Sequence, residues 1–348
     1  MSDAVSIRGM RLAFAGAGAF GVPTLNRLHA AGAEIVRVYT QPDKPAGRGK
    51  KLTPTPIAVA AEALGLSVVR TADLNAEVLP PIDALVVIAF GQKIASHVTQ
   101  HPAFGAINLH ASSLPKYRGA APIHAALLAG ETVVGNSIIR LAEKMDAGDV
   151  LGEGRLTVGE TETTGELHDR LAEAGAPLVE RVLIELRTGT ATEMPQDYTA
   201  ATLARKLSRE TTRIDFGRDA AAIANQIRAL SPWPGCRVRV LDDDAEVARL
   251  TLVRARPLAP SPGTPGEGWG GGPPSTRATL LSSDPLPNPP PGYRERGPGT
   301  VREDGTISCG VGSLELIEVQ PEGKRPMPLS AYKNGRPWHA GLRLESIV

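Results

Sequence analysis

The sequence predicts an α/β protein, in which a mostly parallel, Rossmann-like sheet with helices on both faces precedes a smaller β-rich domain. Two observations support this prediction. Between residues 10 and 192, short apolar runs alternate with amphipathic segments, which is the pattern of buried parallel strands joined by helices. From residue 207 onward, short strand-like runs bounded by turn residues predominate, and this pattern favours a small β-barrel.

In the first domain, strands and helices are expected to alternate along the chain. The expected strands are residues 10–16, 34–40, 66–70, 81–90, 105–109, 133–141 and 150–158. The expected helices are 22–31, 55–64, 120–130 and 167–187, with a turn into a further helix at 91–94. The long helix follows a capping box from Thr163 to Glu166, whose side chains satisfy free backbone groups at a helix start.

The same patterns divide the chain into segments. We expect residues 1–9 to form a flexible N-terminus, 10–192 the first domain, 193–206 a linker and 207–348 the second domain. Within the second domain, a helix is expected at 219–230 and strands at 237–241, 248–255, 306–309 and 314–319.

The second domain is interrupted by a Pro/Gly-rich insertion. Pro and Gly make up 21 of the 44 residues from 257 to 300, and such a composition cannot bury enough apolar surface to fold. We therefore expect this insertion to be disordered. A ligand for an SH3-type domain is the less favoured interpretation, because no docking pattern is clear.

The composition narrows the class of protein. A length of 348 residues suggests two domains, and a net charge of +1 means that any attraction to a polyanion must come from a local patch. Cys236 and Cys309 have no neighbouring metal ligands and are typical of a reducing compartment. The chain start lacks the apolar region of a signal peptide, and the longest apolar run, 84–90, is too short to span a bilayer. We expect a cytoplasmic, monomeric protein without a metal ion.

A glycine-rich turn links the first expected strand to the first helix. Gly16, Gly18 and Gly21 match the GxGxxG pattern of dinucleotide-binding folds. That function needs an acidic residue at the end of the second strand, which instead ends Tyr39-Thr40-Gln41. We favour glycines that let the strand and helix pack closely, with an NAD(P)-binding oxidoreductase as the alternative.

A basic loop follows the second strand. Residues 41–51 contain one anion, Asp43, and four cations, which are Lys44, Arg48, Lys50 and Lys51. Charged loops are commonly solvated connections, but cations on a loop also contact nucleic-acid phosphates. The residues alone leave both interpretations open.

The strongest candidates for catalysis lie at the end of the strand 105–109. Asn108 and His110 are two residues apart, so their side chains share one side of the strand at its carboxyl end. Asp146 lies in a tight polar turn further on. An amide can stabilise an oxyanion, an imidazole can move a proton, and a carboxylate can orient either the imidazole or a water molecule. Because no nucleophile is clearly placed, although Ser112 and Ser113 are near, direct acyl transfer is favoured over covalent catalysis.

Simpler interpretations of these residues remain open at this point. His110 also fits an ordinary buried histidine, and Asp146 fits a turn residue before glycine. A metal site formed by the two is less favoured, because only two strong ligands are visible.

Three motifs together resemble the folate-dependent formyltransferases. They are Asn108-Leu-His110, the run from Ser112 through Pro115 to Gly119, and Met-Asp-Ala-Gly-Asp around Asp146. The resemblance implies that Asn108, His110 and Asp146 are catalytic. It also implies 10-formyltetrahydrofolate as co-substrate, with a binding site lined by Ser112, Ser113, Leu114, Pro115, Phe90 and Ile94.

The basic loop is similar to the acceptor-stem loop of the branch of this family that formylates initiator methionyl-tRNA. This similarity implies that Arg48 steers the acceptor stem, while Lys44, Lys50 and Lys51 contact phosphates. It further implies that 10–192 is the catalytic domain and that the second domain is an OB-like barrel contacting the tRNA.

The chain departs from the family pattern in three places. The turn from Gly16 to Phe20 replaces Gly-Thr-Pro-x-Phe, Ser113 stands where leucine is usual, and the insertion at 257–300 is not a family feature. Two alternatives of different kinds stay open beside the oxidoreductase. One is a formyltransferase for a small amine, such as glycinamide ribonucleotide or an amino-sugar nucleotide, and the other is a non-catalytic RNA-binding module.

Overall fold

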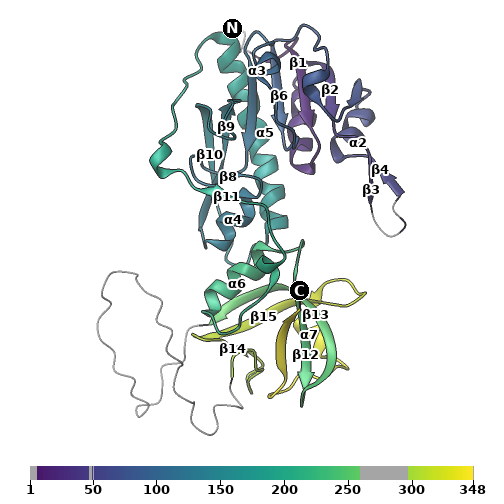
Figure 1. Ribbon diagram of the computed structural model, residues 1–348, viewed down its shortest axis with the longest axis vertical. Helices are drawn as coiled ribbons and strands as arrows, with labels where there is room; N and C mark the ends of the chain where they lie inside the picture. Colours follow the sequence, from purple (N-terminus) through teal and green to yellow (C-terminus); the bar gives the residue numbers. More distant parts are fainter. Residues whose placement is uncertain (1–5, 47–48, 50, 259–296, 348) are drawn as a thin grey trace, which may run out of the picture. The chain divides into compact units, whose positions relative to one another are not determined.

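The structure, a computed structural model, describes residues 6–46, 49, 51–258 and 297–347. The chain forms two compact units, Met1–Leu207 and Ser208–Val348 (Figure 1). Within the described residues, no helix is both long enough and apolar enough to cross a membrane.

A seven-stranded sheet forms the centre of the first unit. Its spatial order is β10-β9-β7-β6-β1-β2-β5. The strands are β1 (Arg11–Gly16), β2 (Glu34–Thr40), β5 (Val68–Arg70), β6 (Ala84–Ile88), β7 (Ala106–His110), β9 (Val133–Arg140) and β10 (Val150–Thr157). From β5 to β7 all pairs are parallel, whereas β9 runs antiparallel to β7, and β10 antiparallel to β9. The prediction of a mostly parallel α/β sheet is confirmed, with an antiparallel edge.

Helices connect and cover these strands. They are α1 (Val22–Ala30), α2 (Pro56–Ala63), α3 (Ser96–Thr99), α4 (Pro122–Leu128) and α5 (Thr164–Thr188), with short 3-10 turns at Ala19–Gly21, Leu74–Ala76 and Tyr198–Ala200. The long helix α5 lies along the sheet and packs against α1, β9 and β10 (Figure 1). Its predicted capping box is present, since Thr163 Oγ1 accepts from Glu166 N–H and Glu166 Oε2 accepts from Thr163 N–H.

The glycine-rich turn after β1 serves close packing. A Cβ atom on Gly16 would lie 2.9 Å from the Ile88 carbonyl oxygen, and one on Gly21 would lie 3.2 Å from Ile57 Cδ1. Only glycine lets β1, α1, β6 and α2 approach this closely, as the packing interpretation of the turn predicted.

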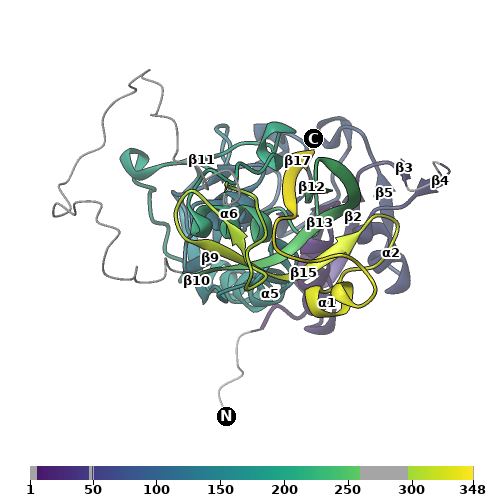
Figure 2. The ribbon, with the colours of Figure 1, turned by 90° about the horizontal axis from the view of Figure 1, so that it is seen from below.

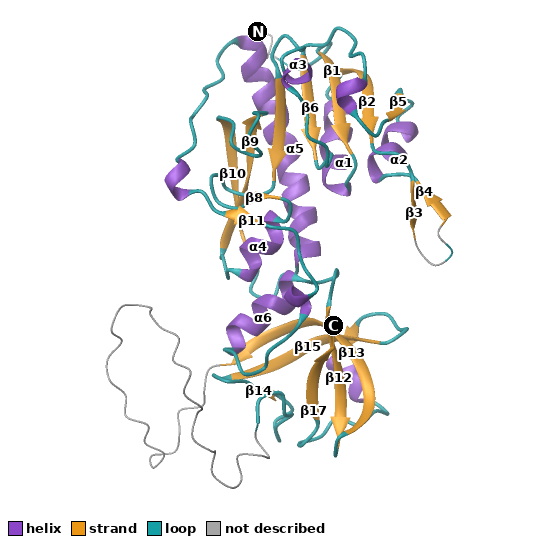
Figure 3. Cartoon of the chain, in the orientation of Figure 1, coloured by secondary structure: helices purple, strands orange, loops and turns teal. Residues whose placement is uncertain are grey.

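Three segments of the first unit carry more structure than the sequence indicated. The basic loop contains a hairpin of β3 (Lys44–Ala46) and β4 (Lys51–Thr53), which extends away from the sheet (Figure 3). Residues 6–9, expected in a flexible N-terminus, are held in place, because Ile7 is buried and the Arg187 guanidinium donates to the carbonyls of Ser6 and Arg8.

The segment 193–206, expected as a linker, pairs twice with the first unit. Met194 forms a β-bridge with Val150, and β11 (Leu203–Ala204) pairs in parallel with β8 (Arg118–Gly119). These hydrogen bonds fix the segment beside the polar loop that follows β7.

The second unit is a β-barrel with two helices. Its elements are α6 (Ala220–Ala229), β12 (Cys236–Asp242), β13 (Ala245–Leu258), β14 (Ile307–Ser308), β15 (Ser313–Pro321), β16 (Met327–Pro328), α7 (Leu329–Lys333) and β17 (Arg343–Ile347), with a 3-10 turn at Glu210–Thr212. The antiparallel sheet runs β14-β15-β13-β12-β17, and its strands are seen from below in Figure 2. Bridges from Thr300 to Arg343 and from Val301 to Ile307 join the two edge strands, so the sheet closes.

The expected insertion begins and ends inside regular structure. Pro257 and Leu258 are the last residues of β13 and pair with Leu314 and Ser313 of β15, which corrects the expected boundary at 257. At the other end, residues 297–299 form a turn that leads to Thr300, and Thr300 forms a β-bridge with Arg343. The rest of the expected insertion, 259–296, lies outside the described residues.

Candidate active site

Asn108 and His110 lie at the carboxyl end of β7, as predicted. Asn108 is partly buried, and His110 is 6% exposed. Because the two residues alternate with Leu109 along the strand, their side chains leave the sheet on the same side. They stand where open α/β sheets bind ligands, beyond the ends of parallel strands.

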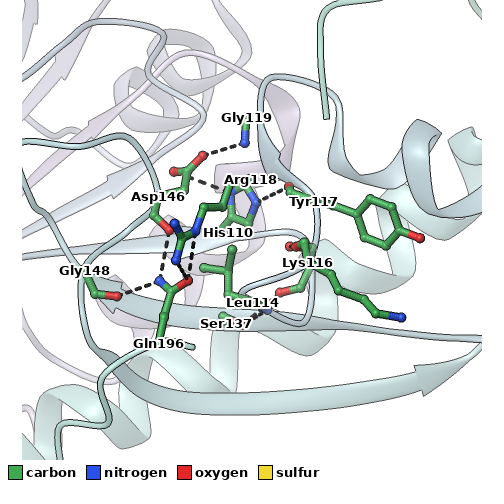
Figure 4. Close-up of polar contacts among 11 residues, drawn as sticks. His110, Leu114, Lys116, Tyr117, Arg118, Gly119, Ser137, Asp146, Gly148 and Gln196 are labelled. Atoms are coloured by element: carbon green, nitrogen blue, oxygen red, sulfur yellow. Dashed lines mark hydrogen bonds and ion pairs between the residues drawn. The ribbon is translucent and has the colours of Figure 1, made fainter. Parts of the chain in front are cut away.

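The imidazole of His110 has two different neighbours. Nε2 lies 3.0 Å from the backbone carbonyl oxygen of Tyr117, and Nδ1 lies 3.7 Å from Asp146 Oδ1 (Figure 4). A ring nitrogen that faces a carbonyl acceptor must carry the hydrogen, so Nε2 donates and Nδ1 is left to face the carboxylate. The 3.7 Å separation is too long for a direct hydrogen bond and fits transfer through one water molecule or a substrate group.

Asp146 lies in a tight turn between β9 and β10, with a left-handed backbone at φ +52°. Its Oδ2 accepts from the Gly119 N–H at 2.8 Å, while Oδ1 faces His110. Gly148 permits the turn, because a Cβ there would lie 1.9 Å from the Arg140 carbonyl oxygen. The carboxylate is thus both a turn residue and the partner of the imidazole.

The loop between β7 and β8 is held in one shape by a hydrogen bond within it and by two hydrogen bonds to Ser137 of β9. Ser112 Oγ donates to the Lys116 carbonyl at 2.6 Å, and Ser137 Oγ donates to the Ser112 carbonyl at 2.8 Å. The Leu114 N–H donates to Ser137 Oγ at 3.0 Å, and the Leu114 side chain packs with Ile139 and Val150. A fixed loop places the Tyr117 carbonyl where it orients His110.

A cavity of about 330 Å³ lies beside this loop. Ser112, Ser113, Leu114 and Pro115 line it together with apolar side chains of α4, β9 and α5. Phe90 and Ile94 do not line it, because they pack in a different core cluster, together with Tyr39 and Val98. The structure therefore brings four of the six predicted folate contacts together.

Charged and polar groups mark the rim of the cavity. Glu131 Oε1 accepts from the Tyr117 hydroxyl at 2.8 Å and from Lys116 Nζ at 3.0 Å. These hydrogen bonds lower the pKa of the Glu131 carboxyl, the tyrosine contributing most. Burial, and then the hydrogen bond to Glu131, raises the pKa of Tyr117 to about 12, so Glu131 is the charged member of the pair.

Two of the four predicted tRNA-binding cations are described. Lys51 is exposed on β4, and Lys44 Nζ donates to Gln41 Oε1 at 2.5 Å. Gln41 Nε2 in turn donates to the Phe90 carbonyl at 2.6 Å, which ties the base of the hairpin to the segment after β6. Arg48 and Lys50 lie outside the described residues.

Two residues that sequence reasoning missed stand next to Asp146. Arg118 and Gln196 are 4% and 6% exposed; Arg118 donates to Gln196, and Gln196 donates to the Asp146 turn (Figure 4). In the sequence, Arg118 is one residue of the motif that ends at Gly119, and Gln196 lies in the expected linker. No local pattern marks either, since their contacts span 78 and 50 residues of sequence.

An imidazole and an amide near the end of a parallel strand, with a carboxylate facing the imidazole, are groups that can serve acyl transfer. No group of three or more His, Cys, Asp or Glu side chains that could hold a metal ion occurs in the described part of the chain. Comparison with protein families agrees with this chemistry. Residues 10–183 match the formyl transferase family, and residues 206–337 match the formyl transferase C-terminal domain. The fold and the site thus define a two-domain formyl transferase.

Individual relatives narrow the class. The chain is 38% identical to the methionyl-tRNA formyltransferase of Moorella thermoacetica, over 95% of this chain and 98% of that protein. It is 37% identical to the methionyl-tRNA formyltransferase of Methylococcus capsulatus, over 96% and 99% of the two chains. The chain belongs to the methionyl-tRNA formyltransferase family.

Solved structures share the fold. The N-formyltransferase from Helicobacter canadensis, in complex with folinic acid and dTDP-3-aminofucose, superposes with a TM-score of 0.59 at 15% identity, covering 90% of this chain and 99% of that chain. Family membership decides against the oxidoreductase and the non-catalytic RNA-binding module as alternatives, and the family is folate-dependent.

Proposed function

We propose that this enzyme transfers the formyl group of 10-formyltetrahydrofolate to the amino group of initiator methionyl-tRNA, and that Asn108, His110 and Asp146 carry out the transfer. The product, N-formylmethionyl-tRNA, serves translation initiation. The facing pair of His110 Nδ1 and Asp146 Oδ1, 3.7 Å apart beside Asn108, is the observation that supports this most strongly.

The reaction forms a bond between the amino nitrogen and the formyl carbon, and it breaks the bond from that carbon to the donor nitrogen. When bound, the folate supplies the formyl group. Negative charge develops on the formyl oxygen as the amine attacks, and the Asn108 amide, near the carboxyl end of β7, can donate to it. As Nδ1 of His110 takes up the proton that the amine loses, the imidazolium that forms adds positive charge near this oxygen.

His110 and Asp146 also move the proton that the amine loses. Because Nε2 of His110 donates to Tyr117, the proton exchange uses Nδ1, which faces Asp146. The carboxylate stabilises the imidazolium while it carries the proton, and the proton then passes through water to the departing donor nitrogen.

The residues around the β7 loop fit a donor site. The cavity beside Ser112, Ser113, Leu114 and Pro115 is mostly apolar, and its 330 Å³ is at the lower end of small-molecule pockets, which begin at about 300 Å³. The assignment of Phe90 and Ile94 to the donor site rests on the family resemblance, because the described cavity is not lined by them.

The hairpin of β3 and β4 supplies the contact to the tRNA acceptor stem in this proposal. Lys44 and Lys51 place positive charge on it, and Arg48 and Lys50 belong to the same basic segment. Each phosphate neutralised adds affinity that falls with salt. Residues 10–192 serve as the catalytic domain, 193–206 connect it to 207–348, and the OB-like barrel there contacts the tRNA body. The enzyme acts as a monomer in the cytoplasm, where charged tRNA is present.

An acceptor comparison tests the function. Purified enzyme and 10-formyltetrahydrofolate are incubated with methionyl initiator tRNA, glycinamide ribonucleotide or an amino-sugar nucleotide, and the formylated product is quantified by mass spectrometry. We expect formylation of methionyl-tRNA, with uncharged tRNA as the blank. Formylation of a small amine alone would refute the proposed acceptor.

A further inference from the structure

The turn that carries Asp146 is held by a residue far along the chain. Gln196 Nε2 donates to the Asp146 carbonyl at 2.9 Å and to the Gly148 carbonyl at 2.7 Å. The Tyr198 hydroxyl donates to the carbonyl between them, that of Ala147, at 3.1 Å. Three consecutive carbonyls of the turn therefore accept hydrogen bonds from side chains of one segment.

The turn needs such support because its backbone is strained. Asp146 has a φ of +52°, a left-handed conformation that residues with a side chain adopt only uncommonly. Strained conformations persist only where the surroundings over-determine them, and they gather at functional sites. Here the strain directs Oδ2 to the Gly119 N–H and leaves Oδ1 facing His110.

Arg118 fixes the orientation of Gln196. Its Nε and Nη2 donate to Gln196 Oε1 at 3.1 and 2.7 Å, and its guanidinium lies 4.7 Å from the centre of the Tyr198 ring. The amide of Gln196 thus has its oxygen occupied by a cation and its nitrogen directed at two carbonyls. Among the described residues, no carboxylate lies within ion-pair distance of the Arg118 guanidinium, so its charge is directed to this amide and this ring.

We propose that Gln196 is a positioning residue for Asp146, oriented by Arg118, and that its two hydrogen bonds hold the Asp146 carboxylate at the distance from His110 that formyl transfer requires. This role rests on the proposed function of Asp146. Gln196 touches neither substrate nor the reacting atoms, and it acts through the backbone of the turn. An amide is needed, because a carboxylate at this position would still pair with Arg118 but would oppose the carbonyls of Asp146 and Gly148.

A double-mutant cycle tests this role. The variants are Gln196→Glu, Gln196→Leu, Asp146→Asn and the two double variants, and kcat and KM for methionyl-tRNA are measured with the full chain, together with Tm. We expect either Gln196 change to lower kcat about 10–100-fold with a smaller effect on KM, because misplacement of a catalytic group costs this much. In the Asp146→Asn enzyme, the same changes should lower kcat less than about twofold further. A residue that acts only on overall stability would lower activity equally in both backgrounds.

Gln226 provides a matched control. It is 5% exposed in the second unit, and its Nε2 also donates to two carbonyls, those of Thr211 at 2.7 Å and Arg213 at 2.9 Å. Gln226→Glu should lower Tm but leave kcat within about twofold of wild type. The outcomes separate the two proposals. If Asp146→Asn leaves kcat unchanged, the catalytic role of Asp146 fails. Suppose instead that Asp146→Asn lowers kcat. The positioning role alone is then overturned if Gln196→Glu has no effect on kcat, or if it lowers kcat by the same factor in the wild-type and in the Asp146→Asn enzyme.

Discussion

The carboxylate of Asp146 faces Nδ1 of His110 at 3.7 Å, and Asp146→Asn removes its charge while keeping its shape. An asparagine oxygen can still accept from the Gly119 N–H, so the turn keeps that contact. What the variant loses is the attraction between a carboxylate and the imidazolium that forms during proton transfer. The variant therefore separates electrostatic stabilisation from folding.

The size of the effect follows from the distance. The side chains of His110 and Asp146 are only 7% and 15% exposed, so an effective dielectric constant of about 20 is appropriate. At 3.7 Å, two unit charges then attract by about 4 kcal/mol. If between half and all of the positive charge is present in the transition state, the variant loses about 2–4 kcal/mol, which lowers kcat about 30–1000-fold.

Steady-state formylation of methionyl-tRNA, with thermal unfolding measured in parallel, provides the assay. His168 and Asp169 form another histidine–carboxylate pair, at 2.9 Å, with the Asp169 side chain 82% exposed. Asp169→Asn is therefore a matched control and should leave kcat unchanged. A kcat for Asp146→Asn within about threefold of wild type, at unchanged Tm, would refute the electrostatic role of the carboxylate.

Three further predictions concern the hairpin, the turn and the cavity rim. Lys51→Ala should weaken tRNA binding and reduce the slope of log Kd against log salt concentration by about one, whereas Lys51→Arg keeps it; equal slopes would exclude a phosphate contact. Gly148→Ala places a Cβ 1.9 Å from the Arg140 carbonyl oxygen and should lower the free energy of unfolding by at least about 2 kcal/mol in denaturant titrations, whereas Gly154→Ala, whose Cβ would meet only Leu178 at 3.7 Å, should not. The pKa of Glu131 is lowered in the folded state, so the stability that it adds is fully present above its unfolded value of 4.5 and is lost as pH falls through the folded-state pKa. The difference in Tm between wild type and Glu131→Gln should accordingly shrink below pH 4.5, and a difference that grows there would contradict the assigned charge.

The sheet of the first unit was predictable because each strand can be recognised from the apolar pattern of its own residues. A run such as Ala84–Ile88 is buried at every position, and continuous apolar runs of this length are typical of strands covered on both faces. The direction of β9 was not predictable in this way. Its antiparallel pairing with β7 depends on the path of residues 111–132, which a strand pattern does not encode.

In the candidate site, too, local spacing was predictable, whereas contacts made through loops and distant segments were not. Asn108 and His110 share a strand, so their spacing alone placed them on one side of it. The contacts of His110 with Tyr117 and of Asp146 with Gly119 arise from loop shapes, and the contacts of Gln196 cross 50 residues. Segment 193–206 is held by hydrogen bonds rather than by an apolar face, so it lacks apolar periodicity and its pattern predicts a linker.

In the second unit, the sequence patterns did not predict the short strands β16 and β17. β17 (Arg343–Ile347) and β16 (Met327–Pro328) are brief and carry charged or proline residues, so they lack the alternation that marks β12. Closure of the barrel depends on Thr300 and Val301, and two residues are too few to show the alternation by which a strand is recognised. The existence of a β-rich domain was thus visible in the sequence, but the strands that complete it were not.

The dependence of the Asp146 turn on Gln196 has a consequence for how the protein is made. A ribosome adds about 5–20 residues per second, and 48 residues separate Gly148 from the amide that supports it. The strained turn therefore emerges about 2–10 s before its hydrogen-bond donors. Throughout that interval the sheet can form, but the carbonyls of the turn lack their side-chain donors, Gln196 and Tyr198. If Gln196 positions Asp146 as proposed, catalytic competence comes late in synthesis, after the surrounding strands are in place. A nascent chain that ends at residue 192 would then carry every predicted catalytic side chain without the hydrogen bonds that position Asp146.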